Sequence, residues 1–383
     1  MEETAIQQTA RTGLREIAKE FLRLGFVAFG GPPVHFAMME EHFVRQKKWL
    51  SHERFLDLIG AVNLLPGPSS TELTIYLGEV RAGLAGLLVA GLCFILPSAV
   101  MVAALAWAYE KFGKLPQVQG LLFGIKPIVV ALILPALWNL GKVALKNPGL
   151  VFLAVAVILL AILGMNVITL LICAGLFWML VSRARHESKL DAIAWPGFGV
   201  FAAGVGSGIA LLPVFLYFLK IGAVVFGSGY VLLAVLRADL VSQLHWLTDA
   251  QLLDAIAVSQ ATPGPYFTVS TFIGYLLGGW KGAGLATLGM FLPAFVFVAV
   301  TAKFLPRIRK SPIAGAFLDG VNAAAVALMA EISFQFARAA LVNVPAVVLG
   351  LVSLLLVIRF RVNSAWLVLG GAVAGILLQV FRG

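Results

Sequence analysis

Long apolar stretches separated by short polar connections dominate the chain. Four of them have the roughly 20 apolar residues that a helix needs to cross about 30 Å of hydrocarbon. They are residues 84–109, 118–141, 283–305 and 320–341. Shorter apolar pairs, which predict tight hairpins of short or tilted spans, are 148–163 with 166–181 and 344–358 with 364–381. Apolar and polar residues do not alternate as in a strand, so the pattern predicts an all-α polytopic membrane protein with about 10–13 membrane segments.

The pattern also repeats within the chain. The segment from Phe21 to Pro68 returns 197 positions later, from Phe218 to Pro265. After one deletion the match continues at an offset of 196, as in Leu96-Pro97 with Leu292-Pro293. A duplicated apolar chain interrupted by Gly and Pro is typical of transporters with two structural repeats. We therefore expect an N-terminal repeat over residues 1–182, a linker over 183–208 and a C-terminal repeat over 209–383. Each repeat reads as two Gly/Pro-broken segments followed by about four spans.

Composition supports membrane insertion and excludes several other classes. The chain is 61% hydrophobic and 12% charged, with a net charge of +10, whereas soluble proteins are about 25% charged. The basic residues are scattered over short loops, as topology control requires, so nucleic-acid binding is excluded. Zinc-protease, paired-cysteine, Gly-x-Ser-x-Gly and P-loop motifs are all missing, which predicts neither an enzyme nor an ATP-driven pump, and no cofactor or metal.

The basic loops indicate how the repeats are oriented. The loop 45–54 carries four basic residues, whereas its copy, 237–249, carries Arg237 against two aspartates. Later in the repeat the bias reverses, because 303–310 carries four basic residues and the equivalent loop of the first half only Lys111 and Lys114. Positive loops lie in the cytoplasm, so equivalent loops lie on opposite faces and the repeats are inverted.

Inversion requires either an odd number of crossings in each half or one additional crossing between the halves. The apolar stretch 197–213 is the candidate for that additional crossing. The sequence leaves both solutions open.

Two kinds of helix break recur at matched positions. Phe29-Gly30-Gly31-Pro32-Pro33 is echoed by Phe226-Gly227-Ser228-Gly229-Tyr230, and Pro66-Gly67-Pro68-Ser69 by Pro263-Gly264-Pro265-Tyr266. Glycine allows close backbone approach, and proline suits the first turn of a new helix. Each break is therefore expected to open a helix N-terminus at membrane depth, where N–H groups and the helix dipole attract anions. Four such ends would surround a tetrahedral oxyanion, although Gly and Pro also produce simple kinks.

The candidate substrate-binding residues are the break residues, their polar neighbours and one cation within an apolar segment. They are Gly30, Gly31, Pro32, Asn63, Pro66, Gly67, Pro68, Ser69, Ser70, Lys126, Gly227, Ser228, Gly229, Tyr230, Gln260, Pro263, Gly264, Pro265 and Tyr266. The neighbouring hydroxyls and amides bind ligand oxygens or satisfy freed backbone groups. Lys126 either attracts the anion or extends to the membrane interface.

Carboxylates inside apolar segments are the candidates for proton coupling: Glu72, Glu79, Asp57 and Asp254. Asp57 and Asp254 occupy equivalent positions, and capping of neighbouring helices is the favoured alternative for this pair. His35, just after the first break, reads as an ordinary polar neighbour rather than a proton relay.

These motifs resemble the chromate ion transporter (CHR) family in its long, two-domain form. The resemblance covers nearly the whole chain and rests on Phe21-Leu22-Arg23-Leu24-Gly25, Phe29-Gly30-Gly31-Pro32, Trp49-Leu50 and Leu65-Pro66-Gly67-Pro68 with their second copies. It implies chromate efflux coupled to protons, with sulfate as a competing dianion.

The sequence thus predicts a secondary active transporter that exports chromate across the plasma (inner) membrane, within the lipid bilayer, with a homodimer left open. The alternatives are a sulfate or other oxyanion importer, a passive anion channel, and a membrane-embedded assembly protein.

Overall fold

A computed structural model describes residues 13–63, 65–113, 115–185, 211–225, 229–302, 312–360 and 362–380. Within these ranges the regular secondary structure is helical, without a β-strand. Four helices are long and apolar enough to cross a membrane, and five shorter helices are apolar. The outer surface is apolar as well: Phe152 is 75% exposed and Trp366 71%. Such a surface suits lipid rather than water, and the protein is an integral membrane protein.

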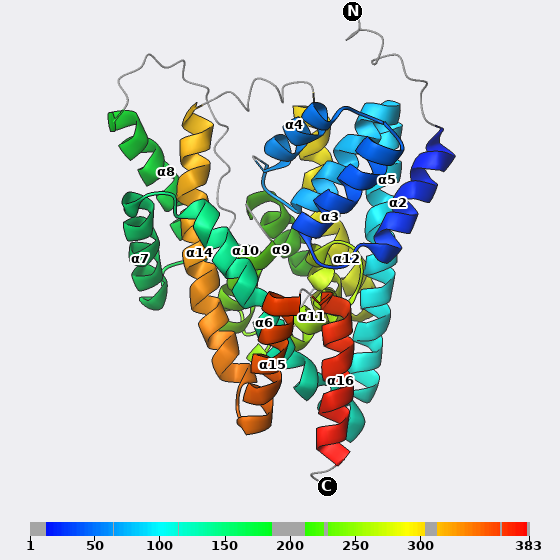
Figure 1. Ribbon diagram of the computed structural model, residues 1–383, viewed down its shortest axis with the longest axis vertical. Helices are drawn as coiled ribbons and strands as arrows, with labels where there is room; N and C mark the ends of the chain where they lie inside the picture. Colours follow the sequence, from blue (N-terminus) through cyan, green and yellow to red (C-terminus); the bar gives the residue numbers. More distant parts are fainter. Residues whose placement is uncertain are drawn as a thin grey trace, which may run out of the picture.

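The helices of the two halves follow the same order, with one additional 3₁₀ turn in the second half (Figure 1). The first half consists of α2 (Leu14–Val27), α3 (Pro32–Met39), the π-helical η1 (Glu40–Gln46), α4 (His52–Val62), α5 (Ser69–Phe112), α6 (Pro116–Ala144), α7 (Pro148–Ile162) and α8 (Val167–Arg185). The second consists of α9 (Leu211–Val224), α10 (Gly229–Leu236), η2 (Arg237–Gln243), α11 (Asp249–Ala261), the 3₁₀ turn η3 (Tyr266–Thr268), α12 (Val269–Thr301), α14 (Pro312–Ala340), α15 (Val344–Phe360) and α16 (Ser364–Val380).

Helices α5 and α12 are each a hairpin of two helical arms. Gly83 and Gly279, both with a φ of 60°, interrupt them at equivalent positions. A Cβ on Gly78 would overlap the carbonyl of Gly86, and a Cβ on Gly274 that of Gly282. Residues eight apart in a straight helix lie about 12 Å apart, so the chain must fold back here. The short first arm follows the Pro-Gly-Pro break, and the long second arm is one of the expected spans.

The repeats are inverted and interlocked. Figure 1 shows α8 ending at the top of the view, whereas its counterpart α16 ends at the bottom beside the C-terminus. Helices α7 and α8 pack on α14 of the other repeat, and α15 and α16 pack on α6. Close approach uses small residues, since a Cβ on Gly124 would overlap the Gly371 carbonyl and one on Gly320 that of Ala174. Neither half therefore buries its long helices alone.

The connection between the halves falls on residues 186–210, outside the described residues. The expected linker and most of the expected additional crossing at 197–213 belong to this segment, so both stay predictions. The basic loop 303–310 also lies outside the described residues.

Candidate functional site

The Gly/Pro segments do interrupt helices at matched positions. In the first half α2 ends at Val27 and α3 begins at Pro32, after Gly30 (φ 108°) and Gly31 (φ 80°). Helix α4 ends at Val62, and α5 begins at Ser69 after Pro66-Gly67-Pro68. In the second half Pro263-Gly264-Pro265 leads first into η3 and then into α12.

Two equivalent hydrogen bonds join the breaks of one half to those of the other. The Gly67 N–H donates to the Val225 carbonyl at 2.8 Å, and the Gly264 N–H donates to the Ala28 carbonyl, also at 2.8 Å. Gly67 corresponds to Gly264 and Ala28 to Val225 at the offset of 197. Each Pro-Gly-Pro thus docks on the carbonyl end of the first helix of the other repeat. The breaks meet around the pseudo-twofold axis, and these two N–H groups are occupied by the junction.

Glycine is required where these bonds form. Gly67 has a φ of 132° and Gly264 a φ of 95°, values that side chains with a Cβ disfavour. A Cβ on Gly264 would lie 2.7 Å from the Cβ of Ser98, and one on Gly67 would lie 2.8 Å from Oε1 of Glu72. A larger residue at either position must displace the neighbouring repeat or the carboxyl group.

His35 strengthens one of the two junctions. It is fully buried, and its Nε2 donates to the Ala28 carbonyl at 3.1 Å, the same oxygen that accepts from Gly264. Its ring meets Phe94 edge-on with centroids 5.7 Å apart. Ser98 and Thr268 add a hydroxyl pair at 3.0 Å between the halves. His35 therefore acts on the geometry of the break in this structure.

A small central cavity lies between the first break of one half and the second break of the other. Its lining consists of Gly30, Gly31, Pro32, Ser259, Gln260, Thr262, Gly264 and Tyr266, and its volume is about 20 Å³. That volume holds about one water molecule. The Ser259 hydroxyl and the Gln260 amide nitrogen have no hydrogen-bond partner among the described residues. The cavity thus unites six of the sequence-derived candidates and presents unsatisfied donors.

The remaining break candidates are not among the described residues that line this cavity. Ser69 and Ser70 are buried at the start of α5, whereas Asn63 is exposed at the end of α4. Gly227 and Ser228 lie outside the described residues, and of Gly229 and Tyr230 only the helical backbone at the start of α10 is described.

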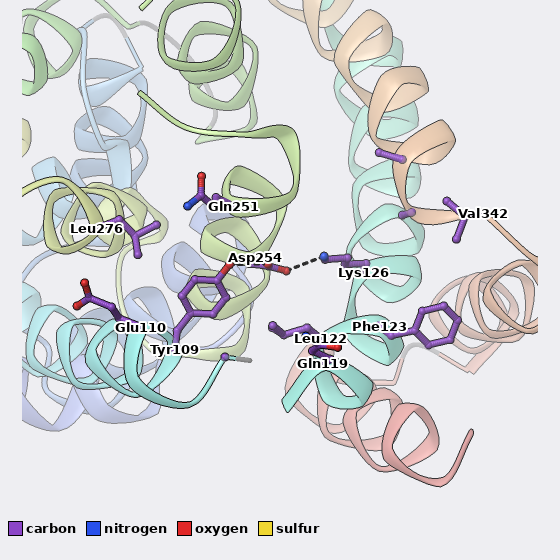
Figure 2. A pocket seen from close by; sticks show the side chains of 13 residues that line it. Tyr109, Glu110, Gln119, Leu122, Phe123, Lys126, Gln251, Asp254, Leu276 and Val342 are labelled. Atoms are coloured by element: carbon purple, nitrogen blue, oxygen red, sulfur yellow. Dashed lines mark hydrogen bonds and ion pairs between the residues drawn. The ribbon is translucent and has the colours of Figure 1, made fainter. Parts of the chain in front are cut away.

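Lys126 and Asp254 lie apart from the breaks, in a larger cavity of about 570 Å³ (Figure 2). Lys126 Nζ is 3.0 Å from Asp254 Oδ1, and the Tyr109 hydroxyl donates to Asp254 Oδ2 at 3.0 Å. Asp254 does not cap α11, because Thr248 caps that helix. The Asp254 carboxylate instead joins α11 to α5 and α6. Asp57 is the sixth residue of α4, and Ser51 caps that helix.

Glu72 differs from the other acidic candidates. Its side chain is fully buried in the first turn of α5, and neither carboxylate oxygen has a hydrogen-bond partner among the described residues. At the offset of 197 its counterpart is Val269. Asp57 and Glu79 both interact with neighbouring groups. The structure thus separates a carboxyl group at the break from a paired one in the larger cavity.

Sequence reasoning missed Ser259, Tyr109 and Ser98. A single hydroxyl in an apolar helix carries little information by itself, because it usually bonds its own backbone. Only the approach of a second helix from the other repeat gives these three their roles.

Inverted repeats, broken helices and an apolar exterior define a two-repeat membrane transporter. A family model described as chromate transporter matches residues 15–179 and again residues 212–376, and the matches start 197 residues apart. The chain belongs to the chromate transporter family, as its motifs predict.

The relatives agree with this assignment. The chromate transport protein of Cupriavidus metallidurans is 34% identical over 371 residues, which cover 94% of this chain and 91% of the relative. The probable chromate transport protein of Synechococcus elongatus is 31% identical over 353 residues, covering 89% of each. The uncharacterized transporter YwrB of Bacillus subtilis is 28% identical over 170 residues, 43% of this chain but 86% of the relative, and so has the length of one repeat. No solved structure matches.

Proposed function

We propose that the protein is a secondary active transporter that exports chromate across the plasma membrane in exchange for protons. Two relatives that match it over about nine-tenths of their length are named as a chromate transport protein and a probable chromate transport protein. The observation that carries the proposal is the pair of equivalent bonds, Gly67 to Val225 and Gly264 to Ala28, which bring the breaks of both repeats to one axis. Transporters with inverted repeats bind substrate at such junctions of broken helices.

The oxyanion binds in the central cavity between Gly30, Gly31 and the second Pro-Gly-Pro. The Ser259 hydroxyl and Gln260 amide are donors without partners there, and a chromate or sulfate oxygen accepts such bonds. Helix α3 starts at this cavity and points its N-terminal dipole end toward it. With space for about one water molecule, the described conformation is closed around the site. Substrate entry therefore requires the repeats to move apart, as alternating access demands.

Glu72 carries the coupled proton. A carboxylate that is fully buried and without a partner is too costly to keep charged, so this side chain is neutral in the closed conformation. Its position against Gly67 connects its protonation to the geometry of the break. Val269 cannot titrate, so only the first repeat holds a proton at this position. Movement that brings water to Glu72 on one side releases the proton there.

Transport by purified protein in liposomes tests the proposal. Chromate uptake into vesicles with an imposed pH gradient should exceed uptake without one, and sulfate should compete. Sulfate uptake that exceeds chromate uptake in both protein orientations would favour the oxyanion importer. Flux that follows the electrochemical potential of the anion without pH-driven accumulation would identify a channel.

A further inference from the structure

The cavity that contains Lys126 is a separate compartment from the central one. None of the Gly/Pro break residues lines it, and helices from both repeats enclose it: α5 and α6 from the first, α11, α12 and α14 from the second. Its volume of about 570 Å³ falls in the usual range for small-molecule sites. It is large enough for a hydrated tetrahedral dianion, which the central cavity is not.

Lys126 is the one basic side chain among the described residues that line this cavity. Gln119, Gln251 and the Tyr109 hydroxyl supply hydrogen-bonding groups around it, as Figure 2 shows. The Lys126 side chain is 22% exposed and that of Asp254 5%, so solvent reaches the ammonium end of the pair. The ion pair is close, yet Asp254 Oδ1 is not aligned in a hydrogen bond. The pair is therefore suited to separation.

The charged groups around Asp254 give the cavity lining a net negative charge in the paired state. Lys126 faces it from α6, Tyr109 and Glu110 approach from α5, and Glu110 also interacts with the Tyr275 hydroxyl of α12. Helix α14 reaches the cavity with Ala339 and Ala340, and α16 has no ionisable side chain. One positive and two negative charges leave the lining at −1. Protonation of Asp254 makes the net charge of the lining zero and releases the Lys126 ammonium group from the ion pair.

The residues at the equivalent positions of the two repeats do not form a second Lys–Asp pair of this kind, because the lysine is not repeated. At the repeat offsets Lys126 corresponds to Asn322 and Asp254 to Asp57, so an amide occupies the position equivalent to the lysine. Figure 1 places the end of α5, which borders the cavity, at the bottom of the view, and α4, next to the basic loop 45–54, at the top. The cavity thus lies at the less basic end, away from the cytoplasm by the positive-inside rule.

We propose that this cavity is a second oxyanion site, an outer vestibule in which Asp254 and a divalent tetrahedral oxyanion compete for the ammonium group of Lys126. When Asp254 is protonated, Lys126, Gln119 and Gln251 bind the oxyanion. When Asp254 loses its proton, its carboxylate displaces the anion toward the solvent. The ligand class rests on the proposed function, since the oxyanion is the transported species, but the vestibule itself does not depend on the direction of transport.

Sulfate binding to the purified full-length protein tests the proposal, because sulfate stays a dianion from neutral to mildly acidic pH. Wild-type affinity, measured by titration calorimetry, should increase on acidification. Asp254→Asn keeps an acceptor for Tyr109 and should bind sulfate about tenfold more tightly at neutral pH, with no further gain on acidification. Lys126→Gln should bind weakly at every pH, whereas Lys126→Arg should retain the pH dependence.

Asp319→Asn is the matched control, since it disrupts another Lys–Asp pair between the repeats, Lys146 to Asp319 at 2.8 Å, outside the cavity. It should bind sulfate as the wild type does. Equal, pH-dependent sulfate binding in wild type and Lys126→Gln would overturn the vestibule. The absence of chromate transport by the wild type would instead overturn the proposed function and leave the binding result standing.

Discussion

Substitution of Gly264 by alanine tests whether transport depends on the junction between the repeats. Gly264 has a φ of 95°, and strain of about 1–2 kcal/mol is expected for a residue with a Cβ in this region. The new methyl group would also lie 2.7 Å from Ser98 Cβ, and such overpacking costs about 1–3 kcal/mol. Together these terms weaken the closed junction by at least about 2 kcal/mol, which lowers its population about thirtyfold relative to a displaced one.

Gly164→Ala provides the matched control. Gly164 has a φ of 86° between α7 and α8, and a Cβ there would have no atom within 4 Å. It therefore imposes comparable backbone strain without overlap. We expect Gly264→Ala to lose about tenfold or more of its chromate flux per folded protein in proteoliposomes, while Gly164→Ala retains most of it. Adding Ser98→Gly to Gly264→Ala should restore part of the flux, because the overlapping methylene is removed.

The reasoning would be refuted if Gly264→Ala transported at the wild-type rate, or if both glycine variants lost the same fraction of flux. Equal losses would show that strain alone matters and that contact with the other repeat does not.

Three further substitutions address other parts of the molecule. Ser259→Ala should weaken apparent chromate affinity about fivefold, which is the effect of losing one hydrogen bond of about 1 kcal/mol. The Ser333 hydroxyl bonds the Met329 carbonyl, so Ser333→Ala should leave the affinity unchanged. Equal affinities of the two variants in competition assays would remove Ser259 from the site. Glu72→Gln should permit chromate flux down its own gradient but abolish pH-driven accumulation, and retained accumulation would assign the proton elsewhere. Hydrogen bonds from Lys47 to Glu20 and Glu16 raise the pKa of Lys47. Lys47→Gln should therefore slightly lower the thermal midpoint in detergent at neutral pH, because exposed ion pairs contribute about 1 kcal/mol or less to the free energy of unfolding. This difference should be present below the ordinary lysine pKa and disappear as pH rises through the raised one.

The sequence predicts the repeated breaks well because their cause is local. Proline at the start of a new helix and glycine in a left-handed conformation leave a direct signal at each position, and duplication makes it visible twice. The hairpin turn at Gly83 has a similar signal in the copied Gly279 and in the small residues Gly78 and Gly86, but the hydrophobic pattern predicts only its second arm as a span. Glycine inside an apolar run is common in membrane helices, so the reversal is seen only when the two arms contact each other.

The pairing of Lys126 with Asp254 could not be obtained from the sequence. These residues are distant in the chain and belong to different repeats, and each is compatible with several roles until the neighbouring helices are placed. The expected grouping of Lys126 with the Gly/Pro breaks followed from charge alone. The structure instead locates Lys126 in its own cavity, because α11 packs against α6 at that point.

The most direct test of the central claim is chromate flux in proteoliposomes under independently imposed pH and voltage gradients. Exchange of chromate for protons predicts accumulation against the chromate gradient whenever a pH gradient is present, even with the membrane potential set to zero. Flux that vanishes at zero potential and zero chromate gradient, whatever the pH gradient, would contradict it.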